Sequence, residues 1–377
     1  MNPKCLVFLI VSLSYAGAQT QMLALAKTLK ARGWEIKVIT MMKPEGSTIV
    51  PMLEALDIEW ASLDVTRGSS NPLSPISNLR NLVKKWRPTI LHSHMIHANI
   101  LARLARLVTP IPILICTAHN TVEGGRTREI MYRLTDPLCD YTTNVSQVAV
   151  TRYIKEGIAP KNKISLLPNG LDSSQFKSNP GARSRLRETL GLGNDFSWLA
   201  VGRLDDQKDF STMLKAFAAL KHLQSKLLIV GEGPHLEMLQ TLVKDLKLET
   251  RVSFLGVRRD VPDIMNAVDA YLMSSVMEGL PMVLLEAAAS RLPIVSSDVG
   301  GNREIVLEGQ SGFLVPHSQP QALANAMQKL MDLSPKEQQS MGQKGREHVI
   351  ATYDLEHVVD QWEALYSKHM KAKKIGV

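Results

Sequence analysis

The stretch CLVFLIVSLSYAGAQTQMLALAKTLKARGWEIKVIT, residues 5–40, contains a complete strand–helix–strand pattern. The apolar run Cys5–Val11 predicts a buried strand, and a turn with Gly17 follows it. Apolar residues then recur at the spacing of an amphipathic helix, at Met22, Leu25, Ala26 and Leu29. Glu35–Thr40 is rich in valine and isoleucine and predicts a second strand.

The same stretch also imitates a secretory signal peptide. Lys4 precedes the apolar run, and Ala16-Gly17-Ala18 would supply the small residues of a cleavage site. Cleavage would remove the first strand of a pattern that the rest of the chain repeats. The strand is therefore the favoured interpretation.

Strands and helices alternate along the whole sequence. Short runs rich in β-branched residues occur near 5–11, 35–40, 89–93, 112–117, 140–144 and 164–167, and again near 197–201, 226–230, 251–255, 270–274, 293–297 and 312–315. Helical patterns fill most of the intervals, at 74–86, 94–108, 144–156, 208–223, 234–247, 319–332 and 335–352. Such alternation is typical of parallel sheets covered on both faces by helices. The sequence predicts an α/β fold with two Rossmann-like, doubly wound domains.

The alternation breaks once, in a loop-rich stretch between Pro168 and Trp198. We therefore expect an N-terminal domain over 1–176, a C-terminal domain over 177–354, and a last helix within 355–377 that returns to the first domain. Open α/β sheets bind ligands at the carboxyl ends of their strands, so the two domains are expected to face each other across a ligand-binding cleft.

The composition of the 377 residues excludes several classes of protein. Hydrophobic residues make up 45% and charged residues 21%, as in soluble globular proteins. Aromatic residues are only 5%, which leaves few stacking platforms for a nucleic-acid partner, and none is expected. Cys5, Cys116 and Cys139 form no CxxC motif, so the sequence favours a reducing compartment without a disulfide framework or a zinc site. No apolar stretch reaches the roughly 18 residues of a membrane span, and a cytoplasmic protein is expected.

The net charge of +8 is concentrated in the first half. Residues 1–177 carry 21 Lys+Arg against 12 Asp+Glu, whereas residues 178–377 carry 23 against 24. This asymmetry indicates a polyanionic partner, an anionic membrane surface, or simply a solvated basic face. Ser77–Arg87 predicts a helix that is apolar on one side and basic on the other. That helix could rest on an anionic membrane, although covering the sheet is the favoured interpretation.

Two cations follow the strand near 197–201. Gly202 permits a close backbone approach, Arg203 follows it directly, and Lys208 lies five positions later, where a helix begins. Arginine can bind two phosphate oxygens at once, and lysine adds a compact positive charge. The pair therefore suits a diphosphate, although two solvated surface cations are the ordinary alternative.

A second motif runs from Ser274 to Glu286. A strand leads into the turn Glu278-Gly279-Leu280-Pro281, and Pro281 is expected at the first helical position. The amides of the following Met282 and Val283 would then be free to bind an anion. Carboxylates do not bind phosphate, so Glu278 and Glu286 are expected to bind hydroxyls of a sugar and a ribose. A loop acid and a solvated helix residue are the alternative, but Glu286 is surrounded by apolar neighbours.

In combination these residues resemble the retaining glycosyltransferases of GT-B family 4. The resemblance is carried in the second half by Arg203, Lys208, the Glu278–Glu286 motif, and Gly300-Gly301 with Glu304. In the first half it is carried by Gly17-Ala18-Gln19, His92-Ser93-His94, Thr117-Ala118-His119 and Pro168-Asn169-Gly170-Leu171-Asp172. It covers nearly the whole chain. Where the family often has two glycines, this chain has Ala16-Gly17, which implies a stiffer loop.

The resemblance implies a nucleotide-sugar donor, UDP-sugar by expectation, bound mainly by the second domain. It implies that Arg203 and Lys208 neutralise the diphosphate, that Glu286 binds the ribose and that Glu278 binds the donor sugar. The remaining donor contacts that it implies are Gly17, Gly202, Val257, Gly279, Leu280, Pro281, Met282 and Val283. No separate cofactor and no metal are implied.

The resemblance further implies an acceptor held by the first domain. It places His119 against the donor sugar, as part of the catalytic set with Arg203, Lys208 and Glu278, and it offers His94 and Asn169 as acceptor contacts. The acceptor is expected to be a glycan, a lipid-linked or a phosphorylated sugar, with a possible peripheral contact to an anionic membrane. His92, His94 and His97 could be mistaken for a metal site, but no further ligands are apparent.

The activity implied is transfer of a sugar with retention, in which the departing phosphate deprotonates the acceptor. Two alternatives remain open. A GT-B sugar-nucleotide epimerase shares the architecture but needs acid and base groups that the Glu278 motif does not supply. A non-catalytic scaffold that only binds a nucleotide sugar is the second alternative. Such a protein would not need all four of the charged residues Arg203, Lys208, Glu278 and Glu286.

Overall fold

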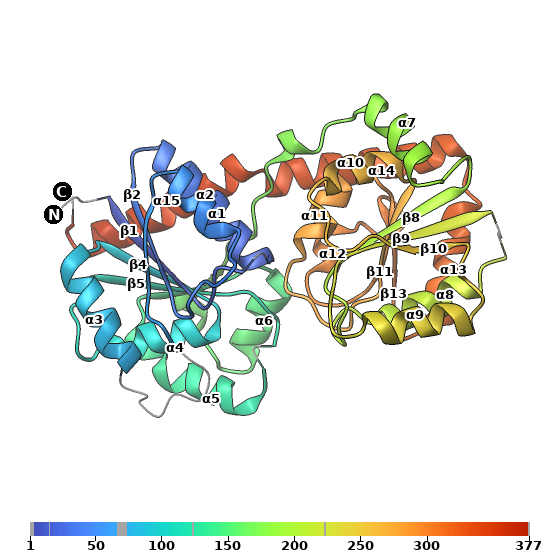
Figure 1. Ribbon diagram of the computed structural model, residues 1–377. Helices are drawn as coiled ribbons and strands as arrows, with labels where there is room; N and C mark the ends of the chain where they lie inside the picture. Colours follow the sequence, from blue (N-terminus) through green and yellow to red (C-terminus); the bar gives the residue numbers. More distant parts are fainter. Residues whose placement is uncertain (1–3, 15, 66–73, 123, 222–223, 376–377) are drawn as a thin grey trace. The chain divides into compact units, whose positions relative to one another are not determined.

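The computed structural model describes residues 4–14, 16–65, 74–122, 124–221 and 224–375. The chain forms two compact units. The first contains the residues up to Gly170 and those from Leu355 onward, and the second runs from Leu171 to Asp354. Each unit has its own sheet and its own hydrophobic core (Figure 1).

The first unit is built on a parallel sheet with the strand order β3-β2-β1-β4-β5-β6-β7 among the described residues. Its strands are β1 (Cys5–Ile10), β2 (Glu35–Thr40), β3 (Glu59–Ser62), β4 (Ile90–His94), β5 (Ile113–Ala118), β6 (Tyr141–Asn144) and β7 (Ile164–Leu166). Its helices are α1 (Gly17–Ala31), α2 (Ile49–Ala55), α3 (Ser74–Trp86), α4 (Ile96–Ala105), α5 (Arg126–Thr135), α6 (Gln147–Lys155) and α15 (Leu355–Ala372), with the 3-10 turns η1 (Asp136–Leu138) and η2 (Lys161–Lys163).

The residues of β1 show why this sheet is covered on both faces. Successive side chains of a strand point to opposite faces, and all of β1 is apolar and buried. Leu6 and Phe8 pack with α1 and α15, whereas Val7 and Leu9 pack with α3 and α4. Figure 1 shows α1 and α15 on one side of the sheet and α3, α4 and α5 on the other.

The second unit repeats the plan with the strand order β10-β9-β8-β11-β12-β13. Its strands are β8 (Phe196–Val201), β9 (Ser225–Val230), β10 (Val252–Phe254), β11 (Ala270–Met273), β12 (Ile294–Ser297) and β13 (Gly312–Val315). Its helices are α7 (Pro180–Thr189), α8 (Phe210–Ala218), α9 (Leu236–Asp245), α10 (Val261–Ala267), α11 (Met282–Ala289), α12 (Asn302–Ile305), α13 (Pro320–Met331) and α14 (Pro335–Tyr353), with the 3-10 turn η3 (Ser173–Gln175). Its core packs Trp198 and other sheet residues against α8, α9 and α13.

Both sheets are parallel, with helices on both faces and the strand order of doubly wound folds. The α/β, two-domain prediction is confirmed. The chain passes between the units twice, after Gly170 and after Asp354.

The first passage lies earlier than the sequence boundary at 176–177. The amide of Leu171 donates to the carbonyl of Tyr353 at 2.7 Å, and Leu171 pairs with Asp354 in a short parallel bridge. The carbonyl of Phe176 accepts a hydrogen bond from Arg346 at 2.7 Å. Residues 171–176 are therefore fastened to α14 of the second unit. No local pattern predicts these contacts, because their partners lie near the other end of the chain.

The last helix, α15, packs in the first unit. Arg32 at the end of α1 forms ion pairs with the acidic residues that line one side of α15, namely Glu356, Asp360 and Glu363. The apolar side of α15 packs against the same face of the sheet as α1. Its buried residues are Val358, Val359, Trp362 and Tyr366.

Candidate active site

The candidate site in the second unit lies at the carboxyl edge of its sheet. There a glycine follows β8, at Gly202, and another follows β9, at Gly231. The φ angle of Gly231 is +135°, and a Cβ there would lie 2.0 Å from the carbonyl oxygen of Gly202. A Cβ on Gly202 would in turn meet the aliphatic stem of Lys208 at 3.3 Å. The positive φ angle and the lack of room for a Cβ therefore both require glycine at position 231. At Gly202 it allows Lys208 to lie close against the backbone.

Lys208 and Glu278 form an ion pair in this edge. The Nζ of Lys208 lies 2.5 Å from Oε1 of Glu278. The side chain of Lys208 is 19% exposed and that of Glu278 is 8% exposed, so the pair is largely removed from water. The sequence assigned these two residues to different parts of a donor. The structure brings them into direct contact.

Hydrogen bonds hold the two loops that carry the pair. The hydroxyl of Ser274 donates to the carbonyls of Lys208 and Asp209 at 2.9 and 2.8 Å. The amide of Val276 donates to the carbonyl of Gln207 at 2.9 Å. Asp209 then caps α8 by accepting from the amide of Thr212 at 3.1 Å. These hydrogen bonds hold the backbone at Lys208 and at the residues just before and just after it.

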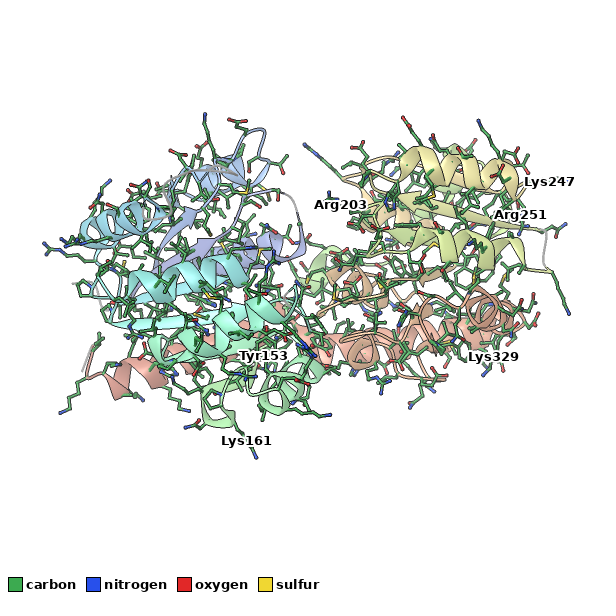
Figure 2. The ribbon with its side chains drawn as sticks, turned by 90° about the horizontal axis from the view of Figure 1, so that it is seen from below. Tyr153, Lys161, Arg203, Lys247, Arg251 and Lys329 are labelled. Carbon is green, nitrogen blue, oxygen red and sulfur yellow. The ribbon has the colours of Figure 1, made fainter. Side chains whose placement is uncertain are left out.

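Arg203 is placed differently. Its side chain is 73% exposed and projects from the loop after β8 (Figure 2). In the described part of the chain its side chain has one ion pair, with Asp205 at 3.6 Å. The structure therefore does not join Arg203 to the Lys208–Glu278 pair. It leaves the guanidinium extended in solvent.

The N-terminus of α11 has unsatisfied amides, as the sequence predicted. Pro281 is the N-cap, with φ −72° and ψ 120°, so the helix begins at Met282 and not at the proline. The correction has a local cause, because the extended ψ of Pro281 is outside the helical range. Within the described chain the amides of Met282 and Val283 have no hydrogen-bond acceptor. The carbonyl of Gly279 accepts from the amide of Gly301 at 2.7 Å, which joins the two glycine-containing loops.

Glu286 lies in the first turns of α11, partly buried among apolar residues. Burial raises the pKa of its carboxyl group to about 7, because the charged form loses hydration. No hydrogen bond or ion pair of its side chain is present among the residues that the structure describes. The pKa of the buried Tyr271 hydroxyl is raised mainly by burial and also by the charges of Glu286 and Glu278. Both carboxylates are thus within electrostatic reach of one phenol.

Val257 lies beyond β10, on the same edge of the sheet. Its side chain is 66% exposed. The neighbouring Arg258 is paired with Asp260 at 2.5 Å. Val257 therefore offers an exposed apolar surface on the edge where the resemblance implied a donor contact.

In the first unit, Gly17 is the first residue of α1 and is exposed. Its N-cap, Ala16, makes no side-chain cap. The adjoining Gln19 is buried and donates to the hydroxyl of Ser12 at 3.2 Å, which holds the loop after β1. The N-terminus of α1 thus lies at the carboxyl edge of its sheet, as expected for Gly17.

Histidines form a connected group at the ends of β4 and β5. The Nδ1 of His94 lies 3.0 Å from Nε2 of His119. His92 stacks against His94 with ring centroids 4.1 Å apart. The two ring nitrogens of His92 are bonded to the hydroxyls of Tyr366 at 2.8 Å and Thr117 at 2.6 Å.

These histidines are neutral at physiological pH. Burial lowers the pKa of His92 and His94 well below the usual value, and it lowers that of His119 to about 4. Among the residues that the structure describes, the buried Nε2 of His94 has no hydrogen-bond partner. No group of three or more ligating side chains suited to a metal ion occurs in the described ranges. His97 is exposed and away from this group.

Sequence reasoning missed Tyr366 and Trp362, which lie against His92, and it did not foresee that Thr117 of the quoted motif would bond to that histidine. The ring of Trp362 lies 4.6 Å from that of His92. Tyr366 and His92 are 274 positions apart in the chain, and no local pattern links them. Asn169 was expected as an acceptor contact. It is 5% exposed, in the segment that follows β7.

Two known family models match this chain. The first, Glycosyl transferases group 1, matches residues 183–348, and the second, Glycosyltransferase Family 4, matches residues 15–175. Together they cover nearly all of both units. Among the described residues, no helix is long and apolar enough to pass through a bilayer.

Curated relatives are similar over most of their length. The chain is 27% identical to the UDP-Gal:alpha-D-GlcNAc-diphosphoundecaprenol alpha-1,3-galactosyltransferase of Escherichia coli, covering 78% of this chain and 79% of that one. It is 27% identical to the N-acetyl-alpha-D-glucosaminyl L-malate synthase of Bacillus anthracis, covering 93% and 94%. It is 28% identical to the GDP-mannose-dependent alpha-(1-6)-phosphatidylinositol monomannoside mannosyltransferase of Mycobacterium tuberculosis, covering 71% of each.

Solved structures show the same fold. The chain superposes on HepE of Anabaena in complex with UDP-glucose with a TM-score of 0.84 at 22% identity, covering 96% of this chain and 99% of that one. It superposes on the sucrose-phosphate synthase of Thermosynechococcus elongatus with a TM-score of 0.85 at 22% identity, covering 97% and 99%. The two family matches and this GT-B fold agree with the charged edge described above, and the chain belongs to the group 1, family 4 glycosyltransferases.

Proposed function

We propose that this protein transfers a sugar, with retention, from a nucleoside-diphosphate sugar to a hydroxyl of an acceptor. The observation that carries the proposal is the Lys208–Glu278 pair beside the free amides of α11. A cation and amide donors suit a diphosphate, and the nearby carboxylates suit hydroxyl groups. UDP is the favoured nucleotide, because the Escherichia coli relative is named for UDP-Gal and HepE was solved with UDP-glucose.

In this proposal donor binding exchanges the partner of Lys208. Without donor, its ammonium group is neutralised by Glu278. A diphosphate carries more negative charge than one carboxylate, so it draws Lys208 away and frees Glu278 to accept hydrogen bonds from the donor sugar. The exposed Arg203 folds onto the same diphosphate, where it can bind two oxygens. Glu286 accepts hydrogen bonds from the ribose.

The chemical step follows from the charges. The bond between the anomeric carbon and the diphosphate oxygen breaks, and the electron pair leaves with the diphosphate. Lys208, Arg203 and the α11 amides stabilise that developing negative charge. The acceptor oxygen bonds to the anomeric carbon on the same face, and its proton passes to the departing phosphate. The step needs neither a protein base nor a metal.

The acceptor is proposed to be a glycan or a lipid-linked or phosphorylated sugar. Two of the relatives are named for lipid-linked acceptors, a diphosphoundecaprenol and a phosphatidylinositol mannoside. His119 is proposed to contact the donor sugar, and His94, whose Nδ1 lies 3.0 Å from Nε2 of His119, is proposed to contact the acceptor together with Asn169. An enzyme with a lipid-linked acceptor would work at the surface of a membrane.

A thermal-shift screen of UDP-, GDP- and ADP-sugars tests the donor. A ligand that binds only the native state raises the unfolding midpoint, and a UDP-sugar is expected to raise it most. Arg203→Ala should lower kcat on the order of 10²–10³-fold, the usual loss for a major electrostatic stabiliser. Unchanged kcat would remove Arg203 from the mechanism. Donor binding without transfer to any acceptor would favour the scaffold alternative, and inversion at a sugar carbon of the free donor would favour the epimerase.

A further inference from the structure

Arg103, in α4, is a cation buried in the core of the first unit. Its side chain is 0% exposed, and in the described part of the chain its one ion pair is with Asp136, 4.0 Å away. That carboxylate is shared, because the Nζ of Lys163 lies 3.5 Å from its other oxygen. The Nε of Arg103 is buried with no hydrogen-bond partner among the described residues. A buried charge is costly unless it is paired, so Arg103 needs a further anionic neighbour.

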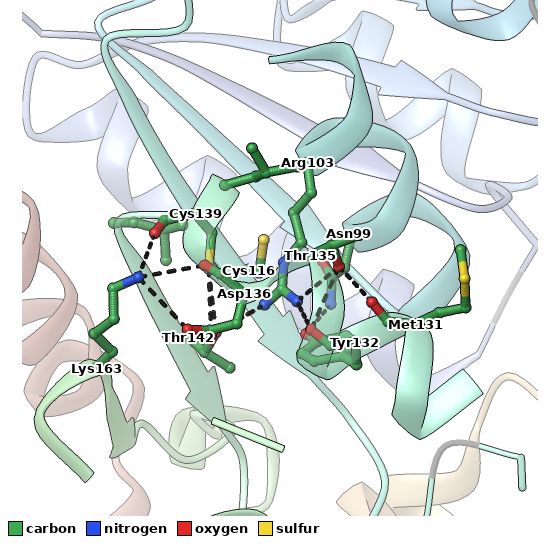
Figure 3. Close-up of polar contacts among 12 residues, drawn as sticks. Asn99, Arg103, Cys116, Met131, Tyr132, Thr135, Asp136, Cys139, Thr142 and Lys163 are labelled. Carbon is green, nitrogen blue, oxygen red and sulfur yellow. Dashed lines mark hydrogen bonds and ion pairs between the residues drawn. The ribbon is translucent and has the colours of Figure 1, made fainter. Parts of the chain in front are cut away.

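Two cysteines lie beside this guanidinium group. Cys116 of β5 is the register partner of Thr142 in β6, and the hydroxyl of Thr142 accepts from Nη2 of Arg103 at 3.0 Å. The Sγ of Cys139 lies 3.6 Å from the same hydroxyl. Both cysteines belong to one buried cluster, and Cys116 has hydrogen bonds with Cys139 and with Arg103. Figure 3 shows both sulfur atoms beside Arg103.

The two sulfur atoms share one proton unequally. Burial alone would raise the pKa of the Cys116 thiol, but the hydrogen bond from Cys139 and the charge of Arg103 lower this pKa to about 6. The hydrogen bond to Cys116 and burial raise the pKa of Cys139. The hydroxyl of Ser93 also donates to the Sγ of Cys116, at 3.4 Å. Cys116 is therefore a thiolate at neutral pH, and it supplies the negative charge that Arg103 needs.

Cys139 also lines a surface pocket. The pocket has a volume of about 410 Å³, and three of its lining residues are the cations Arg106, Lys163 and Lys373. Arg106 and Lys373 both pair with Asp140, at 2.7 and 3.2 Å, and Lys163 donates to the carbonyl of Cys139 at 3.1 Å. Basic side chains near a thiol favour its reactive, deprotonated form. A small oxidant in this pocket meets Cys139 before the other sulfur atom, which does not line the pocket.

We propose that Cys116 and Cys139 form a reversible disulfide when a hydroperoxide enters this pocket, and that the disulfide slows sugar transfer. The effect on transfer rests on the proposed function, whereas the thiol chemistry does not. All three cysteines of the chain are free in the structure. In a reducing compartment such a pair is ordinarily reduced, and a transient disulfide there is typical of redox sensing.

Oxidation takes two steps. The shared proton passes from Cys139 to Cys116, and the Cys139 thiolate attacks one oxygen of the hydroperoxide ROOH. The O–O bond breaks, the departing alkoxide takes the proton from Cys116 and leaves as ROH, and Cys139 becomes a sulfenic acid. Cys116, again a thiolate, then attacks the sulfur of Cys139. The S–O bond breaks, and the hydroxide leaves as water with a proton from solvent. The two sulfurs are oxidised to the disulfide, and the peroxide is reduced to ROH and water.

Arg103 makes the disulfide easy to reduce. Its charge stabilises a thiolate that exists only in the reduced pair, and stabilisation of the reduced form raises the reduction potential. In the disulfide the guanidinium stays buried without that partner. Two equivalents of a small thiol then restore the pair and are themselves oxidised to a disulfide. The bond is therefore expected to persist only while the oxidant does.

The pair is connected to the candidate site through β4 and β5. Cys116 directly precedes Thr117, whose hydroxyl lies 2.6 Å from Nε2 of His92. Ser93, the next residue after that histidine, donates to Cys116. A neutral disulfide sulfur is a poorer acceptor than a thiolate, so oxidation weakens this bond. We therefore expect the ends of the two strands, which carry the histidines, to be less firmly held.

Thiol counting on the full chain tests the chemistry. Reduced protein, freed of reductant, is treated with hydrogen peroxide and then denatured for thiol labelling and peptide mapping. The wild type should lose two of its three thiols, as a bond between Cys116 and Cys139, and dithiothreitol should restore both. Retention of all three thiols would overturn the proposal, and so would a disulfide between two chains.

Single variants assign the two roles. Cys139→Ser should slow the loss of thiols roughly tenfold or more, because the remaining thiolate does not line the pocket. Cys116→Ser should stop at the sulfenic acid of Cys139, which dimedone traps. Cys5→Ser is the matched control, since Cys5 is a buried thiol of the same unit, and it should react like the wild type. Equal rates in Cys139→Ser and the wild type would overturn the route through the pocket.

The thiolate has its own spectroscopic signature. A thiolate absorbs ultraviolet light more strongly than a thiol, so Cys116→Ser should lower the absorbance of the native protein at neutral pH. Cys5→Ser should leave it unchanged, because burial raises the pKa of Cys5 to about 11. Each variant is checked for an unchanged midpoint of urea unfolding. A change no larger for Cys116 than for Cys5 would overturn the assignment of the thiolate.

Transfer kinetics separate this proposal from the proposed function. Peroxide should lower kcat severalfold in the wild type and not in Cys139→Ser, and dithiothreitol should restore it. Because peroxide also oxidises methionine, the two proteins are treated identically. A disulfide that leaves kcat unchanged would overturn the control of transfer. Reduced protein that forms the disulfide on oxidation but binds no nucleotide sugar would overturn the proposed function and uphold the thiol chemistry.

Discussion

Replacing Lys208 by methionine separates its structural role from its chemical one. The change removes the ammonium group and keeps most of the stem that packs over Gly202. Its consequence for the fold comes from Glu278. That carboxylate has an 8% exposed side chain and a 2.5 Å contact to the lysine. In Lys208→Met the carboxylate stays buried without its cation.

The size of the effect follows from burial. Removing one partner of a buried pair costs about 3–5 kcal/mol, whereas exposed pairs contribute about 0–1 kcal/mol. Lys208 is 19% exposed, so the pair falls nearer the buried case, and we expect Lys208→Met to lower the free energy of unfolding by about 2–4 kcal/mol. The double variant Lys208→Met with Glu278→Gln has no buried charge and should recover most of that loss.

The assay is a double-mutant cycle in urea at pH 7.5, with kcat measured on the same four proteins. In the cycle the coupling energy isolates the pair from other effects of each substitution. Both proteins that lack Lys208 should lose about 10²–10³-fold in kcat, because the diphosphate has lost a cation. The pair of Arg258 and Asp260, at 2.5 Å, is the matched control, because its side chains are 33% and 38% exposed, and it should show a coupling below about 1 kcal/mol.

Two results would refute this reasoning. A coupling energy for Lys208 and Glu278 no larger than that of the control pair would mean that the buried ion pair does not exist in solution. Recovery of kcat together with stability in the double variant would mean that Lys208 acts only on the fold. The first result would contradict the buried contact between Lys208 and Glu278. The second would contradict the proposed role of Lys208 in the chemical step.

Three further outcomes are expected. Burial raises the pKa of Glu286 to about 7, above its unfolded value, so this group favours the folded state below the unfolded pKa of about 4.5, and its contribution is lost as pH rises through 7. Glu286→Gln should therefore flatten the pH dependence of the free energy of unfolding between pH 5 and 9, and it should abolish the fall in calorimetric donor affinity that is expected of the wild type below pH 7. Tyr366→Phe leaves a buried nitrogen of His92 without its 2.8 Å partner and should cost about 1–3 kcal/mol in urea unfolding, with no change in donor affinity. Gly231→Ala places a Cβ 2.0 Å from the carbonyl oxygen of Gly202 at φ +135°, so the unfolding midpoint should fall and kcat with it; an alanine as stable as glycine would contradict the close approach.

The alternation of strands and helices could be predicted because most strands of both sheets are buried on both faces. Such strands appear in the sequence as short, continuous β-branched runs. β3 was missed, since its four residues lie at the edge of the sheet and none is buried. α5 was missed as well. Its sequence is polar on average, and several of its apolar residues are exposed instead of forming a buried stripe.

The second-unit site was visible in the sequence because its parts are local. Glu278, Pro281 and Glu286 are fixed relative to one another by one turn and one short helix. The contact between Lys208 and Glu278 was not visible, because residues 70 positions apart meet only through the parallel pairing of β8 with β11. The sequence could supply the two charges. It could not show that they neutralise each other.

The glycines show how a site can depend on residues that touch no ligand. No sequence motif linked Gly231 to the candidate site, yet its lack of a side chain lets the end of β9 approach Gly202, and the amide of Leu204 donates to the carbonyl of Glu232 at 3.0 Å. That contact fixes the start of the loop that carries Arg203 and Lys208. The far end of the same loop is held by Ser274. With both ends held, Lys208 lies in its buried pair, while the exposed side chain of Arg203 is proposed to move from Asp205 onto an incoming phosphate.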